Sequence, residues 1–119
     1  MESPRILLVE DDAGMRQYLR NCLVPLDVRI DEVADGREAL AWLDEHPVDL
    51  LISDVVMPGI GGIALLDALA ERPGLEALPI LFVTGESDEA EATGRPVLRK
   101  PFSGSLLRVY VEEMLKDVR

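Results

Sequence analysis

The sequence predicts an α/β fold in which five strands and five helices alternate, forming one doubly wound parallel sheet with helices on both faces. Short apolar runs alternate with longer amphipathic stretches along the whole chain. Turn-forming prolines and glycines separate these stretches. The inner runs are apolar throughout, as expected for strands covered on both sides. Because the chain has 119 residues, it supports one domain, and we expect residues 1–119 to form it.

The strands are expected where apolar residues run together for a few positions only. The first, Ile-Leu-Leu-Val, and the fourth, Ile-Leu-Phe-Val, have no polar residue and therefore predict central strands. The second run is the weakest because charged residues interrupt it. In chain order the expected strands are residues 6–9, 28–34, 50–53, 80–83 and 97–98.

The helices are expected where apolar residues recur at helical spacing between these runs. Pro25 ends the first helix, and Gly36 opens the second, which ends at His46 and Pro47. The fourth helix is acidic and has no apolar stripe, so we expect it to be short or mobile. The expected helices are residues 13–24, 37–45, 63–72, 88–92 and 106–115.

The composition is strongly acidic, with 12 Lys and Arg against 23 Asp and Glu, a net charge of −11. Such a field repels phosphate backbones and anionic lipids, so we expect no direct nucleic-acid partner and no membrane association. No run is long enough to span a bilayer, and the N-terminus has no signal-peptide pattern. The lone Cys22 lies in an apolar helical pattern, which favours a core position and a reducing, cytoplasmic location.

Polar side chains gather where the expected strands end. Since the carboxyl ends of parallel strands meet at one edge of the sheet, these groups should lie together. Clustered carboxylates repel one another unless a cation neutralises them, and a hard divalent ion such as Mg²⁺ prefers oxygen ligands. The residues in question are Glu10, Asp11 and Asp12 after the first strand, Asp54 after the third, Thr84 after the fourth and Lys100 after the fifth.

Each of these residues alone has an ordinary structural explanation. The acidic triplet could cap the following helix, Asp54 and Thr84 could belong to turns, and Lys100 could be a solvated lysine. Together, these explanations require four separate coincidences at four strand ends. The joint pattern therefore favours a chemical site.

Four motifs contain these residues: Leu7-Leu8-Val9-Glu10-Asp11-Asp12, Asp54-Val55-Val56-Met57-Pro58-Gly59, Thr84-Gly85 and Lys100-Pro101-Phe102. They resemble the motifs of response-regulator receiver domains, and the resemblance spans the chain with matching spacings. It implies a flavodoxin-like (βα)5 fold and a phosphoprotein of two-component signalling. Phe82-Val83-Thr84-Gly85 is similar to a receiver subgroup whose motif reads Phe-Ala-Thr-Gly and which lacks a switch aromatic, here replaced by Val97.

The resemblance implies a role for each matching residue. Asp54 would be the nucleophile that becomes an aspartyl phosphate, and Thr84 would bond a phosphoryl oxygen. Lys100 would pair with Asp54 or its phosphate. For Mg²⁺, Asp11 would be a direct ligand and Glu10 would act through water, with Asp54 and the Val56 carbonyl completing the protein ligands. Asp12 is interpreted as a helix cap only.

The implied partner is a histidine kinase or a histidine phosphotransfer protein, which the first helix commonly docks in this family. Gly14, Met15 and Tyr18 are candidate contacts, although the last two could equally well pack on the sheet. In the family, the residues two positions after the nucleophile and after the threonine influence loss of the phosphoryl group. Here these are Val56 and Glu86. His46, far from the strand ends, is interpreted as a surface residue.

The leading hypothesis is thus a phosphoacceptor module that catalyses no reaction beyond its own phosphorylation and dephosphorylation, with rearrangement of the loop after Thr84 as its switch. The alternative is a pseudo-receiver that acts as a non-phosphorylated adaptor. A phosphatase of the haloacid dehalogenase type also uses an aspartate nucleophile, but it requires Asp-x-Asp, and Val56 occupies the second position. The oligomeric state, the stimulus and the target are left open.

Overall fold

In the computed structural model of the chain, five parallel strands form one sheet in the order β2-β1-β3-β4-β5. The structure describes residues 2–85 and 88–116. β1 is an inner strand, with Ile6 opposite Ile30 of β2 on one side and opposite Leu50 of β3 on the other. The strands are β1 (Arg5–Val9), β2 (Arg29–Val33), β3 (Leu50–Ser53), β4 (Ile80–Thr84) and β5 (Val97–Arg99).

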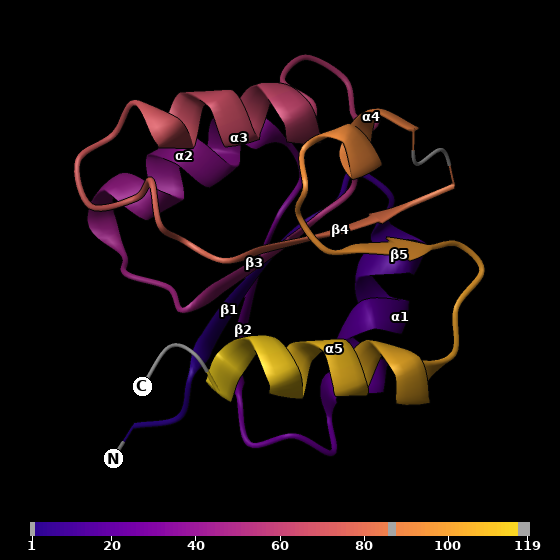
Figure 1. Cartoon of the computed structure of the whole chain (residues 1–119). Coiled ribbons are helices and arrows are strands. Elements are labelled where there is room, and N and C mark those ends of the chain that lie inside the picture. Colours follow the sequence, from indigo (N-terminus) through magenta and orange to yellow (C-terminus); the bar gives the residue numbers. More distant parts are fainter. Residues whose placement is uncertain (1, 86–87, 117–119) are drawn as a thin grey trace.

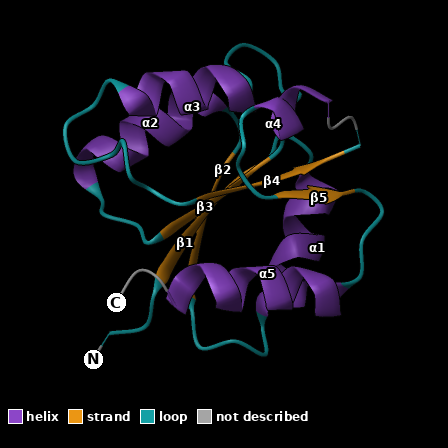
Figure 2. Ribbon diagram, in the orientation of Figure 1, coloured by secondary structure: helices purple, strands orange, loops and turns teal. Residues whose placement is uncertain are grey.

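Five helices connect the strands and cover both faces of the sheet. Figure 1 shows α2, α3 and α4 together above the sheet and α1 and α5 together below it. Figure 2 shows the same layers by element type, with the strands between the two groups of helices. The helices are α1 (Ala13–Leu23), α2 (Gly36–Glu45), α3 (Gly62–Ala70), α4 (Asp88–Ala92) and α5 (Gly104–Lys116). The predicted doubly wound fold is confirmed.

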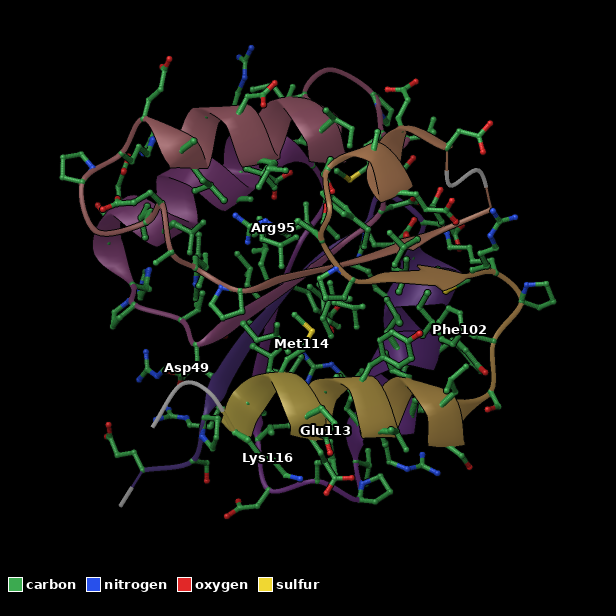
Figure 3. The ribbon with its side chains drawn as sticks, viewed as in Figure 1. Asp49, Arg95, Phe102, Glu113, Met114 and Lys116 are labelled. Carbon is green, nitrogen blue, oxygen red and sulfur yellow. The ribbon has the colours of Figure 1, made fainter. Side chains whose placement is uncertain are left out.

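Alternation along the strands divides the core into two apolar clusters. In β1, Leu7 and Val9 pack against α2 and α3, whereas Ile6 and Leu8 pack against α1 and α5. All four are fully buried, which explains why this strand has no polar residue. Met114 points from α5 toward the second cluster, as Figure 3 shows.

The predicted element boundaries differ from the observed ones by one or two residues, mainly because of capping. Asp35 caps α2 by accepting a hydrogen bond from the Glu38 N–H at 2.9 Å, so the helix already begins at Gly36. Ser103 caps α5 by accepting from the Leu106 N–H, which moves its start to Gly104. α3 begins at Gly62 and ends at Ala70, where a tighter turn from Ala68 to Glu71 replaces the helix.

The fourth helix is short, as predicted. It has five residues, and Ala90 is its single buried residue. Ala90 is completely buried in the cluster with α2 and α3, which explains why so acidic a segment still folds against the sheet. Glu86, which the sequence analysis placed beside the site, lies outside the described residues.

Two further expectations concern burial and membranes. Cys22 is buried in the α1 and α5 cluster, as predicted. His46 is only half-buried, and it stacks on Trp42 with ring centroids 3.9 Å apart at the end of α2. Among the described residues, no helix has the length and apolar character needed to cross a bilayer.

Candidate functional site

The polar residues at the strand ends come together at the carboxyl edge of the sheet. One carboxylate oxygen from each of Glu10, Asp11 and Asp54 lies within 4.8 Å of the other two. We call these three residues the acidic pocket. Glu10 and Asp54 are buried, whereas Asp11 is exposed and lies at the open side. Three hard oxygen donors at this spacing suit a small divalent cation such as Mg²⁺.

Asp54 follows β3, and its backbone N–H donates to the Val9 carbonyl at 3.0 Å, which continues the sheet ladder. Its side chain is held at both oxygens. Oδ1 accepts from the Val55 N–H at 2.6 Å and from the Val56 N–H at 3.3 Å. Oδ2 pairs with the Lys100 ammonium at 2.9 Å. The carboxylate is therefore fixed at the floor of the acidic pocket.

Glu10 is the most deeply buried of the acids, with 1% of its surface exposed. Burial, assisted by the negative charge of Asp54, raises the pKa of Glu10 to about 7, although the Asp12 N–H and Lys100 both favour the charged form. The Asp12 N–H donates to Oε1 at 3.2 Å. A buried acid with so high a pKa needs a nearby positive charge to remain ionised at neutral pH.

Lys100 supplies a positive charge to two of these acids. Its Nζ lies 2.9 Å from Asp54 and 3.4 Å from Glu10. Burial opposes its charged form, but the hydrogen bond and the charge of Asp54 outweigh that effect and raise the pKa of Lys100. The ammonium is thus a fixed cation of the site rather than the solvated lysine of the alternative explanation.

Thr84 and Val56 also lie at this edge. Thr84 is buried at the end of β4, and its carbonyl accepts a hydrogen bond from the Lys100 N–H at 2.9 Å. The Val56 side chain is 62% exposed, and its N–H donates to Asp54. The roles of the Thr84 hydroxyl and the Val56 carbonyl stay predictions.

The loop after Asp54 is held by a close approach at Gly62, the first residue of α3. Its N–H donates to the Val55 carbonyl at 2.9 Å. A Cβ added here would lie 2.4 Å from the Asp54 carbonyl oxygen, and therefore only glycine fits. The same carbonyl accepts from the Ser53 hydroxyl at 2.8 Å. Gly62 and Ser53 together set the Asp54 backbone.

We expect Gly62→Ala to destabilise the protein by about 1–3 kcal/mol, because the overlap with backbone forces β3 and α3 apart. Gly14→Ala is the comparison variant, since Gly14 also lies in the first turn of a helix and its Cβ would meet a side chain, the capping Asp12 carboxylate at 3.3 Å, rather than backbone. Because a side chain can shift where backbone cannot, this variant should be less destabilising than Gly62→Ala. Urea unfolding of both variants measures the difference, and equal midpoints would contradict the role given to Gly62.

The N-terminal part of α1 borders the pocket. Asp12 accepts from the Met15 N–H at 2.7 Å, so its predicted role as the helix cap is confirmed. The Tyr18 hydroxyl donates to the Phe102 carbonyl at 2.8 Å, and Figure 3 shows the Phe102 ring beside α1. Met15, Tyr18 and Phe102 line a pocket of about 510 Å³ that Lys100 and Pro101 complete. Met15 also packs on the core, as one of its two interpretations predicted, and Gly14 is exposed; their role as partner contacts stays a prediction.

Arg16 was not singled out from the sequence, yet it touches the loop that carries the acids. Its Nη1 donates to the Glu10 carbonyl at 2.7 Å. The available signal was its place on α1, four residues after the capping Asp12. That signal is weak because arginine is common on exposed helix faces.

The fold and the site define a class: a doubly wound α/β domain with an acidic pocket and a fixed lysine at the carboxyl edge of its sheet. The family model described as the response regulator receiver domain matches residues 6–112. The chain belongs to the response regulator receiver domain family, whose members act in two-component signalling. The resemblance inferred from the motifs is confirmed.

Two curated relatives and one solved structure illustrate what the chain is similar to. The chemotaxis protein CheY of Pseudomonas aeruginosa is 34% identical, and the match covers 96% of this chain and 98% of CheY. The phosphate regulon transcriptional regulatory protein PhoB of Rhizobium meliloti is 38% identical over 98% of this chain, which spans 54% of that protein.

The third is a solved structure, the receiver domain of the sensor histidine kinase PA1611 from Pseudomonas aeruginosa with a magnesium ion coordinated in the active site cleft. It is 22% identical and has a TM-score of 0.87, and the match covers 96% of this chain and 98% of that one. This likeness supports the fold.

Proposed function

We propose that this chain is a phosphoacceptor domain of a two-component relay, in which Asp54 accepts a phosphoryl group in a Mg²⁺-dependent reaction. The donor is a histidine kinase, a histidine phosphotransfer protein or a small phosphodonor. The observation that carries the proposal is the Asp54 carboxylate, held between two backbone N–H groups and the Lys100 ammonium inside the acidic pocket. Residues 1–119 are proposed to act as one domain.

In the proposed transfer, a carboxylate oxygen of Asp54 attacks the phosphorus atom, and the bond from phosphorus to the donor nitrogen or oxygen breaks. The donor leaves with the bonding electron pair and takes up a proton. The product is an acyl phosphate on Asp54. Such a transition state spreads negative charge over the phosphoryl oxygens, so the protein contributes mainly by positioning and by charge compensation.

Different residues of the site are proposed to provide the positioning and the charge compensation. Val55 and Val56 hold one Asp54 oxygen through their N–H groups, which orients the carboxylate. Lys100 compensates the charge of the transferred group, and Thr84 is proposed to bond a phosphoryl oxygen. Glu10, Asp11, Asp54 and the Val56 carbonyl are proposed to hold Mg²⁺, directly or through water. The ion, when bound, supplies charge neutralisation to the phosphoryl oxygens.

The signal is proposed to be a rearrangement of the segment after Thr84. That segment contains the short helix α4, which a single buried side chain, Ala90, fastens to the core. Val97 occupies the position of the usual switch aromatic and packs partly buried against the same cluster. A segment with so few buried contacts has a low local stability and responds easily to a change at Thr84.

The partner is proposed to dock on the face that Met15, Tyr18 and Phe102 form, because the pocket that they line also includes Lys100, which pairs with Asp54. We also propose a cytoplasmic location, where Cys22 would remain reduced, and no direct contact with nucleic acid or membrane, given the net charge of −11.

The test is to incubate the chain with acetyl phosphate and Mg²⁺ and to follow its intact mass. We expect one phosphoryl adduct, mapped by peptide analysis to Asp54, and no adduct when EDTA removes the metal ion. Amide exchange on the same sample should change within residues 88–96. An unreactive protein would favour the adaptor, and turnover of an external phosphomonoester would favour a phosphatase.

A further inference from the structure

We infer that Arg16 is a positioning residue of the acidic pocket, with its guanidinium, oriented by Glu32 of β2, fixing the peptide that joins Glu10 to Asp11. The inference rests on the proposed function, because the group that Arg16 positions is the proposed Mg²⁺ site. Arg16 itself is not offered as a ligand, since it contacts the loop through a backbone carbonyl.

The Arg16 guanidinium contacts the acidic loop, by which we mean the segment after β1 that carries Glu10 and Asp11. Arg16 Nη1 donates to the Glu10 carbonyl at 2.7 Å, and the Glu10 N–H donates to the Val33 carbonyl of β2 at 3.2 Å. Both backbone groups of Glu10 are therefore held. Because a peptide unit is planar, fixing the Glu10 carbonyl also fixes the backbone nitrogen and Cα of Asp11. Asp11 is the exposed member of the pocket and needs this restraint the most.

Glu32 holds the Arg16 guanidinium. Arg16 Nε lies 3.3 Å from a Glu32 carboxylate oxygen, and both side chains are partly buried, at 22% and 27% exposure. The planar fork of an arginine can contact both partners at once, whereas a lysine ammonium is a single point of contact. Glu32 therefore orients the group that reaches the acidic loop.

Arg20, on the same helix, is a natural comparison for Arg16. Arg20 lies one turn further along α1 and pairs with the other oxygen of Glu32. Its Nη2 donates to the Ile30 carbonyl of β2 at 3.3 Å and so reaches the edge strand rather than the acidic loop. Arg16 and Arg20 share a partner, a charge and a helix, and they differ in what the guanidinium positions.

If Arg16 acts by positioning, its removal should weaken cation binding; if it acts only through its charge, its removal should strengthen cation binding. Removing a positive charge from the neighbourhood of a divalent cation site strengthens cation binding by Coulomb's law. Removing the group that holds the loop weakens it, because outer-sphere partners of metal sites change metal affinity by about 10–100-fold when mutated. The direction of the change in affinity therefore separates the two effects.

The experiment is a calorimetric Mg²⁺ titration of the full chain and of Arg16→Met, Arg16→Lys and Arg20→Met. We expect both Arg16 variants to raise the Mg²⁺ dissociation constant about tenfold. Arg16→Lys keeps the charge and the aliphatic stem, so a loss of Mg²⁺ affinity in this variant reports on the geometry of the guanidinium alone. Arg20→Met should stay within about a factor of two of the parent chain. An unchanged or lower dissociation constant in the Arg16 variants would overturn the inference.

A second readout needs no metal ion. In Mg²⁺-free protein, the Asp12 N–H bonded to Glu10 should exchange faster with solvent in Arg16→Met than in Arg20→Met, with equal thermal midpoints for the two variants. If the parent chain binds no Mg²⁺, the proposed function fails, and this exchange still decides the inference. Equal exchange in both variants would show that Arg16 does not hold the loop.

Discussion

Asp54→Asn is expected to abolish phosphorylation, with no phosphoryl adduct after incubation with acetyl phosphate and Mg²⁺. The amide is not a nucleophile, and its single oxygen can still accept from the Val55 and Val56 N–H groups that Oδ1 serves in the parent chain. The fold should therefore survive while the chemistry is lost. Intact mass spectrometry measures the adduct, and circular dichroism checks the fold.

The matched control is Asp12→Asn, which makes the same chemical change at a neighbouring acid. Asp12 caps α1 through the Met15 N–H, and asparagine caps helices as well as aspartate does. This variant should gain the adduct at the parental rate. An adduct on Asp54→Asn at the parental level would place the phosphoryl group on another residue and would refute the nucleophile proposed here.

Lys100→Met is expected to slow phosphorylation by acetyl phosphate about 100-fold at saturating Mg²⁺, a loss typical of removing one donor that stabilises transition-state charge. Lys100 contacts both Asp54 and Glu10, and no other described lysine or arginine makes an ion pair with either acid. Methionine keeps an unbranched apolar side chain of about the length of the lysine stem and lacks only the ammonium. The rate constant from a time course of adduct formation measures the effect.

Lys116→Met is the control for that variant, because Lys116 pairs with Glu113 on the exposed end of α5. It should leave the rate unchanged. Lys100→Met should not weaken Mg²⁺ binding, since it removes a cation from an acidic pocket. Weaker binding together with slower transfer would mean that the pocket had collapsed, and a parental rate would mean that Lys100 plays no part in the transfer.

Removal of Lys100 and removal of Arg16 are expected to affect Mg²⁺ affinity differently, because the two cations contact different groups. Lys100 pairs with the carboxylates themselves, at 2.9 and 3.4 Å, so its charge competes with a metal ion for the same oxygens. Arg16 contacts a carbonyl of the main chain and leaves every carboxylate oxygen of the pocket to other partners. Two cations at one site can thus have opposite effects on metal affinity.

The helix ends mark the limits of prediction from local pattern. Prolines and glycines predict the helix boundaries within one or two residues, because such residues interrupt a helix wherever they occur. Side-chain caps such as Asp35 were overlooked, although their pattern is local. Helix α4 begins and ends where the pattern predicted, whereas the burial of Ala90 in the cluster with α2 and α3 depends on tertiary packing and not on its neighbours in the sequence.

The sequence by itself determined the class of fold, the strands and the polar residues at their ends. Hydrophobic periodicity and turn residues act locally, and the convergence of parallel strands then brings Glu10, Asp11, Asp54 and Lys100 to one edge. Only the tertiary structure decided the support of the site, in which Arg16 reaches the Glu10 carbonyl and Gly62 leaves room for that of Asp54. These contacts depend on how α1 and α3 are seated against the sheet, and that seating is set by packing of the whole core.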